Sequence, residues 1–188
     1  PPVHYHQRRL SKLSFSMNFA PMTTRRLELR PFGRRDFTSL TNLVSDPRAA
    51  SATANTLFPV DAAEVPAWVK DRYADLIAGD GIAFGCWRRA GHELLGMASL
   101  SLARDRCDIT FWFIADIFGH GYEVEALCRL VGLAFDSLHV AQICAVTHTA
   151  NVNTISILKE SGFRRSCGVP TVGFTSTKRC EVRHFELK

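Results

Sequence analysis

Stretches of alternating or continuous apolar residues along the chain predict seven β-strands. Turn residues near Gly91 and at Arg104-Asp105 separate the second, third and fourth strands, which therefore form a meander. The second closing strand follows a connection rich in Gly, Pro, Thr and Ser. The strands are expected at residues 27–30, 82–88, 94–102, 107–114, 140–146, 163–167 and 179–187.

Apolar residues at helical spacing predict four helices, at residues 34–44, 61–78, 122–138 and 152–161. Asp61 and Glu64 form a capping box at the start of the second helix, and Gly162 ends the fourth. Residues 48–59 are small, polar and without pattern, which indicates a loop. The order βααβββαβαββ predicts one α/β domain with a mixed sheet.

Composition limits the class of protein without identifying it. The chain has 188 residues, enough for one domain with its own core, and no apolar run reaches the ~20 residues of a membrane span. Its six cysteines are scattered and its seven histidines lack ligand spacing, so we expect buried thiols, a reducing, cytoplasmic location and no metal.

The first quarter of the chain carries much of the formal net charge of +5. No acidic residue precedes Glu28, whereas several basic ones do, and three interpretations compete. The segment is an extension upstream of a natural start at Met17 or Met22, a transit peptide, or a basic arm that contacts RNA. We expect residues 1–21 to be a disordered or non-native extension and residues 22–188 to be the domain.

Two glycines, Gly119 and Gly121, lie between the strand that ends near Ile114 and the helix that begins at Tyr122. Glycine lets an anion approach the unpaired N–H groups of a first helical turn, whose dipole also favours negative charge. The pattern predicts a phosphate site. A turn or a helix cap is the alternative explanation of such a pair.

Three motifs resemble the GCN5-related N-acetyltransferases, specifically the ribosomal-protein-alanine (RimJ/RimL-type) branch. They are Thr24-Arg25-Arg26-Leu27-Glu28-Leu29-Arg30-Pro31, Phe118-Gly119-His120-Gly121-Tyr122-Glu123-Val124-Glu125-Ala126, and Asn151-Val152-Asn153-Thr154-Ile155-Ser156-Ile157-Leu158-Lys159-Glu160-Ser161-Gly162-Phe163. The resemblance runs from about Met22 to the C-terminus. It implies a mixed, mostly antiparallel sheet flanked by helices.

The resemblance also implies acetyl-CoA as co-substrate. Its pyrophosphate would bind at Phe118 to Tyr122, including His120, and its pantetheine would lie between strands 107–114 and 140–146. A backbone N–H of Phe113 or Ile114 would polarise the thioester carbonyl. Asp116 stands where relatives often carry Arg or Gln, so backbone N–H groups, assisted by Arg164 or Arg165, would hold the phosphates.

Three further residues have a catalytic or binding interpretation and a structural one. Asp108 stands where the branch often has Glu and would accept the amine proton directly or through water; otherwise it is a solvated strand-end aspartate, and Glu93 and Glu123 are rivals. Thr154 would donate to the departing thiolate, or bonds its own backbone. Asn151 contacts pantetheine or caps its helix.

These observations predict an N-acetyltransferase that moves the acetyl group directly from acetyl-CoA to a primary amine. The basic chain favours a peptide N-terminus, with ribosome contact, over a free polyamine. The alternative is a non-catalytic relative that binds acyl-CoA or RNA, suggested by Asp116 and by Leu158, which replaces a tyrosine common in the family. The oligomeric state is left open between monomer and homodimer.

Overall fold

The structure is a computed structural model that describes residues 20–45, 61–103, 106–166, 172–175 and 178–188. Within these residues the strands are β1 Met22–Thr23, β2 Leu27–Pro31, β3 Gly81–Arg88, β4 Leu94–Ala103, β5 Arg106–Phe113, β6 Gln142–His148, β7 Arg164–Arg165, β8 Val172–Thr175 and β9 Lys178–Leu187. The α-helices are α1 Phe37–Ser45, α3 Val65–Ala78, α4 Tyr122–Gly132 and α5 Val152–Glu160. Short helical segments accompany them at η1 Arg34–Asp36, η2 Ala62–Glu64, η3 Ala115–Ile117 and η4 Leu133–Ser137.

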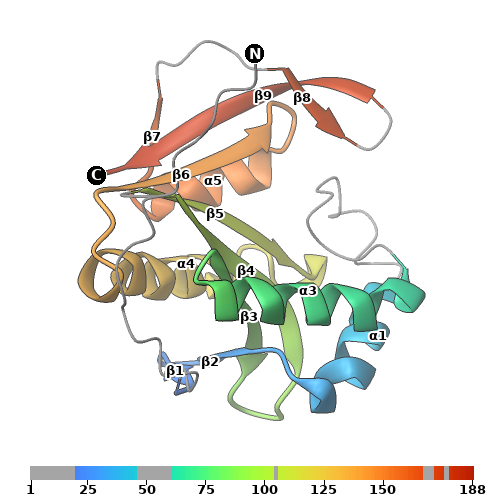
Figure 1. Cartoon of the computed structure of the whole chain (residues 1–188). Helices are drawn as coiled ribbons and strands as arrows, with labels where there is room; N and C mark the ends of the chain where they lie inside the picture. The colour runs from blue at the N-terminus through green and yellow to red at the C-terminus, as the bar shows by residue number, and fades with distance from the viewer. Residues whose placement is uncertain (1–19, 46–60, 104–105, 167–171, 176–177) are drawn as a thin grey trace, which may run out of the picture.

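The strands form one sheet in the order β1-β2-β3-β4-β5-β6-β9-β7, with β8 paired to β9 (Figure 1). Neighbours are antiparallel except β5 and β6, which are parallel. The chain reaches β6 from β5 through α4, because a parallel connection needs a crossover. The predicted mixed, mostly antiparallel sheet with four helices is confirmed.

Helices cover both faces of the sheet, α1 and α3 on one side and α4 and α5 on the other (Figure 1). The Phe32 and Trp68 rings meet edge to face, with centroids 5.7 Å apart, above β3. Gly85 of β3 makes this packing possible, because a Cβ there would lie 2.9 Å from the Phe32 ring. Ala126, Leu127 and Leu130 of α4 are fully buried on the opposite face.

A buried ion pair fixes the connection between β2 and α1. Two nitrogens of the Arg30 guanidinium donate to the two carboxylate oxygens of Asp36, each at 2.8 Å, and the Gly33 N–H donates to the same carboxylate. Asp36 is only 2% exposed. Burial by itself would raise the pKa of Asp36, but the bonds from Arg30 and Gly33 outweigh it, so this pKa is lowered.

The predicted elements match the structure with local differences. β1 and β8 are additional strands, too short or too rich in Gly and Thr to show a period. The predicted helix 122–138 changes at Leu133 into the π-helical turn η4. Strand 140–146 is shifted to Gln142–His148, and the last predicted helix and strands differ by one or two residues at their ends where they are described. The expected extension before Met22, except residues 20 and 21, and the loop 48–59 lie outside the described residues.

Candidate functional site

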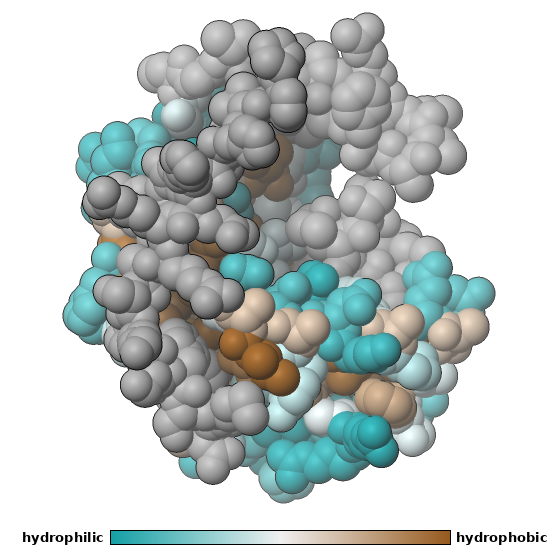
Figure 2. All heavy atoms as spheres, in the orientation of Figure 1, coloured by the Kyte–Doolittle hydropathy of each residue, from teal (hydrophilic) through white to brown (hydrophobic). Residues whose placement is uncertain are grey.

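β5 and β6 pair only at their beginnings. The parallel pairs are Arg106 with Gln142, Cys107 with Ile143 and Asp108 with Cys144. Beyond them β5 continues beside β4, and β6 continues beside β9, so the two strands diverge toward their carboxyl ends (Figure 1). This divergence leaves a gap in the middle of the sheet. On the face that carries α3, hydrophobic and hydrophilic residues are both exposed (Figure 2).

The backbone of β5 presents every second N–H to this gap. The Ile114 N–H donates to the Leu95 carbonyl at 2.9 Å, on the β4 side. Because antiparallel strands direct alternate residues toward the same neighbour, the N–H groups of Ile109, Phe111 and Phe113 point toward β6. Beyond Asp108 the described part of β6 no longer pairs with them. An extended ligand with amide groups could therefore complete the ladder.

The two residues predicted to donate an N–H to the thioester carbonyl differ in their backbone bonding. The Ile114 N–H is already bonded to Leu95, whereas the Phe113 N–H faces the gap. Phe113 and Asp108 lie five residues apart on β5, roughly 17 Å at about 3.3 Å per residue. A reacting carbon that both residues serve must lie between them. Of the N–H groups that face the gap, that of Phe111 is nearest to this position. Phe111 was not predicted as a site residue from the sequence.

Asp108 lies at the point where the strands separate. It pairs across the sheet with Ser101 on β4 and Cys144 on β6, and its side chain is half-buried. Glu186 of β9 is the next residue in this row, opposite Cys144. Burial raises the pKa of the Cys144 thiol, although the nearby charge of Arg106 opposes the shift, and this favours the neutral form.

The turn between η3 and α4 has the backbone conformation that glycine permits. Gly119 has φ 79° and Gly121 has φ 74°, both in the left-handed region. Among the described residues, and apart from the neighbours of Gly119 in the chain, no atom lies within 4 Å of the position that a Cβ of Gly119 would take. The first α4 bond is the Glu125 N–H to the Gly121 carbonyl, so the preceding N–H groups of the first turn have no acceptor within the helix. This is the arrangement expected of an anion site.

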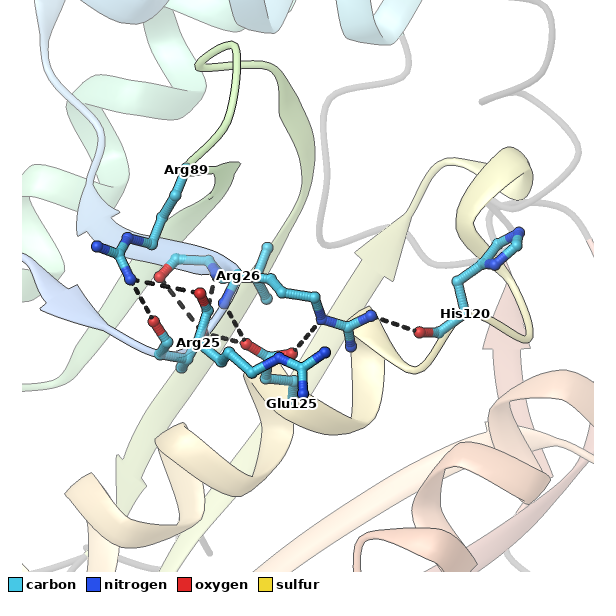
Figure 3. Close-up of polar contacts among 7 residues, drawn as sticks. Arg25, Arg26, Arg89, His120 and Glu125 are labelled. Atoms are coloured by element: carbon cyan, nitrogen blue, oxygen red, sulfur yellow. Dashed lines mark hydrogen bonds and ion pairs between the residues drawn. The ribbon is translucent and has the colours of Figure 1, made fainter.

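Arg26, just before β2, contacts this turn from outside (Figure 3). Its Nη1 donates to the His120 carbonyl at 2.9 Å, and its Nε donates to Glu125 Oε2 at 2.7 Å. Its guanidinium lies 4.1 Å from the centroid of the Tyr122 ring. Phe118 is half-buried against the core, while the His120 side chain is exposed. No role for Arg26 was predicted from the sequence, although Arg26 and Glu125 both lie within the motifs that resemble the family.

Asn151 and Thr154 meet at the start of α5. The Thr154 N–H donates to Asn151 Oδ1 at 3.1 Å, so the side chain of Asn151 caps the helix. Since β5 and β6 are parallel, the α4 and α5 N-termini lie at the same edge of the sheet. Leu158, in the place of the family's tyrosine, is fully buried in the core.

The remaining candidates lie apart from the turn or at its border. Asp116 is exposed in η3, immediately before the Phe118–Tyr122 turn. Arg164 and Arg165 are exposed on β7, which is separated from β6 by β9. No described contact brings these two arginines to the glycine turn. Glu93, a rival for Asp108, is exposed and pairs with Arg88 at 3.4 Å.

The thiols are less uniformly buried than expected. Cys86 and Cys107 are buried, Cys144 is half-buried and Cys128 is exposed. The expectation was wrong for Cys128 because it lies two residues after the buried Ala126, roughly 200° around the helix. Among the described residues no group of three His, Cys, Asp or Glu side chains is arranged to hold a metal ion. Of the described helices, none is both long and apolar enough to cross a membrane.

Comparisons with known proteins place this geometry in a family. Residues 26–164 match the model of the acetyltransferase (GNAT) domain, which is well over half of the 188 residues. No curated protein sequence matches the chain significantly.

Solved structures show the same fold at low sequence identity. RimL, a ribosomal L7/L12 alpha-N-protein acetyltransferase in complex with coenzyme A, has a TM-score of 0.78 and 13% identity over 89% of this chain and 97% of its own. The microcin C7 self-immunity acetyltransferase MccE, in complex with acetyl-CoA and AMP, has a TM-score of 0.77 and 12% identity over 87% and 93%. Spermidine N-acetyltransferase from Vibrio cholerae, in complex with CoA and spermine, has a TM-score of 0.70 and 16% identity over 87% and 96%.

Proposed function

The chain belongs to the acetyltransferase (GNAT) family, and from this premise we propose that it transfers the acetyl group of acetyl-CoA directly to a primary amine. The observation that carries the proposal is the divergence of β5 and β6, which opens beside the glycine turn that begins α4. A phosphate site and an extended slot with free amide groups are thus continuous. This combination fits a ligand with a pyrophosphate at one end and a chain of amides behind it.

The turn and β5 bind the co-substrate in this proposal. The N–H groups of Gly119, Gly121 and the first turn of α4 hold the pyrophosphate, with Phe118, His120 and Tyr122 around it. The N–H groups of Phe111 and Phe113 hold the pantetheine amides or the thioester oxygen. Bound acetyl-CoA supplies the activated carbonyl carbon.

In this proposal Asp108 accepts the proton of the amine, and Thr154 stabilises the departing thiolate. The amine nitrogen forms the new C–N bond while the C–S bond breaks. Asp108, directly or through a water molecule, accepts the proton that the amine loses. The hydroxyl of Thr154 donates a hydrogen bond to the departing sulfur, whose proton finally comes from solvent. Asn151 positions Thr154 by capping the same turn.

We propose a peptide N-terminus as the acceptor. The formal net charge of +5 disfavours a polycation such as a polyamine and favours an acceptor of lower positive charge, or one bound to an anionic particle such as a ribosome. Helices α1 and α3 cover the sheet face on which Asp108 lies and would form the wall of the acceptor site. RimL acts on a protein N-terminus, as its name states, whereas the Vibrio enzyme acts on spermidine.

A second candidate is a relative that binds acyl-CoA or RNA without turnover. Two residues favour it: Asp116 brings a negative charge close to the glycine turn, and Leu158 cannot supply a proton to the sulfur because it is apolar and fully buried.

One assay separates the two functions. Purified protein is incubated with acetyl-CoA and a panel of N-terminal peptides, spermidine and aminoglycosides, and CoA release is followed with a thiol reagent. The proposal expects release with at least one peptide and a rise in the melting temperature when acetyl-CoA is added. Binding without release across the panel favours the non-catalytic relative. An unchanged melting curve at saturating acetyl-CoA contradicts the co-substrate assignment.

A further inference from the structure

Arg26 and Glu125 form an ion pair beside the glycine turn, although they lie about a hundred residues apart in sequence (Figure 3). The Glu125 carboxylate accepts from the Arg26 backbone N–H at 2.8 Å, from Arg26 Nε at 2.7 Å and from the Thr24 hydroxyl. These bonds lower the pKa of Glu125 in spite of its burial, so the carboxylate is ionised at neutral pH. The guanidinium is thus held in a single orientation on the first turn of α4.

The same guanidinium determines which way one peptide group faces. Its Nη1 donates to the carbonyl of His120, which is the residue between the two glycines. In a planar trans peptide the carbonyl of one residue and the N–H of the next point in opposite directions. A His120 carbonyl held toward Arg26 therefore directs the Gly121 N–H away from Arg26. That N–H has no acceptor among the described residues.

We propose that Arg26 and Glu125 are positioning residues that orient the His120–Gly121 peptide, so that the Gly121 N–H faces the pyrophosphate of acetyl-CoA. This inference rests on the proposed function. Without the pair, the peptide beside two flexible glycines can rotate, and the donor must be ordered each time the ligand binds. With the pair, the donor is already in place. Neither residue has to touch the ligand.

The charges of the two residues make this role separable from simple attraction. If Arg26 acted only as a positive charge near the phosphates, neutralising it would weaken binding. Neutralising Glu125, a negative charge at the same place, would then strengthen binding. If the two residues act as one support for the peptide, both changes weaken binding. The sign of the effect of Glu125→Gln therefore distinguishes the two roles.

The test is calorimetry of CoA binding to the full chain. Variants are Arg26→Gln, Glu125→Gln and, as a matched control, Arg89→Gln. Arg89 donates to the carbonyls of Thr24 and Arg25, so it contacts the same segment and carries the same charge, but no described contact joins it to the turn (Figure 3). Melting temperatures are measured alongside, and Arg26→Lys serves if Arg26→Gln does not fold, because a lysine cannot make both bonds of the guanidinium.

We expect Arg26→Gln and Glu125→Gln each to weaken CoA binding by about tenfold or more, the worth of one well-placed hydrogen bond to a charged group. Dephospho-CoA, which keeps the pyrophosphate, should lose affinity by the same factor. Arg89→Gln should bind like the wild type. Tighter binding by Glu125→Gln, unchanged binding by both variants, or a loss confined to CoA would overturn the inference. Failure of the wild type itself to bind CoA would instead contradict the proposed function.

Discussion

Asp108 and Cys144 are the last residues through which β5 and β6 pair, so the carboxylate of Asp108 lies where the sheet opens. Asp108 lies at the end of the gap where β5 and β6 still pair. A base at this position can accept a proton from an amine that approaches the same end of the gap. The turn proposed to hold the phosphates lies beyond the other end of β5. The proposed pyrophosphate site and the proposed acceptor of the amine proton therefore lie at opposite ends of one strand.

Asp108→Asn should lower turnover by roughly 10² or more while leaving CoA affinity unchanged, because the amide keeps the shape and removes the basicity. The residual rate should rise with pH as more of the amine is deprotonated in solution. Initial rates and calorimetry measure the two quantities. Glu93→Gln, at the exposed rival position, is the control and should retain full turnover. Full activity in Asp108→Asn would leave this residue as a strand-end aspartate.

Gly121→Val should weaken acetyl-CoA binding strongly with a modest loss of stability. Its φ of 74° costs a β-branched residue on the order of 1–2 kcal/mol. A Cβ there would lie 3.6 Å from Arg26 Nη2, so the branched side chain would also disturb the contact of Arg26 with the turn. Gly91→Val is the matched control, since Gly91 has φ 86° and open space in the turn between β3 and β4. It should show a similar loss of stability and normal binding. Equal binding by both variants would place the phosphates elsewhere.

Asp36→Asn should destabilise the fold by about 1.5–3 kcal/mol, the cost of losing hydrogen bonds to a charged group, because it leaves the mostly buried guanidinium of Arg30 with only Glu28, 3.3 Å from its Nε, as counter-charge. The pKa of Asp36 is lowered, so the ion pair stabilises the protein above the unfolded value of 3.8 and loses this contribution as pH falls through the lower folded pKa. Urea unfolding at several pH values tests both statements. Arg35→Gln, at an exposed residue 4.0 Å from the same carboxylate, should cost less than about 0.5 kcal/mol.

Glu123→Gln should change how stability depends on pH. Glu123 is 1% exposed, and burial raises the pKa of its carboxyl. The folded state then holds the proton more tightly than the unfolded state, so the wild type loses stability as pH rises from about 4.5 through the raised pKa. Relative to the wild type, Glu123→Gln should gain stability over that interval. A constant difference between the two melting temperatures from pH 4 to pH 8 would contradict this.

The sequence predicted the elements well where a period or a cap exists. Asp61 caps the short segment η2 that leads into α3, and its carboxylate accepts from the Ala63 N–H at 2.9 Å. The spacing of Ala126, Leu127 and Leu130 marks the buried face of α4. The two-residue strand β1 has too few positions to show alternation. We have no physical account of the change from α4 to a π-helical turn at Leu133.

The site was predictable in part. The glycines and the Asn151 motif have local signals, because a turn and a cap depend on neighbouring residues. The divergence of β5 from β6 has none, since Phe111 and Phe113 show the same alternation whether or not a strand lies beside them. The pairing of Arg26 with Glu125 likewise depends on the tertiary fold. The local sequence around either residue does not indicate which residue it pairs with.

The narrow contact between β5 and β6 divides the sheet into two mechanical units. On one side lie β1 to β5, and on the other lie β6, β9 and β7, each held together by antiparallel ladders. Three residue pairs join them within the sheet. Amide hydrogen exchange should therefore report two cooperative units with separate opening free energies. A molecule bound along the gap would bridge both, so its binding should slow exchange in strands that it never touches.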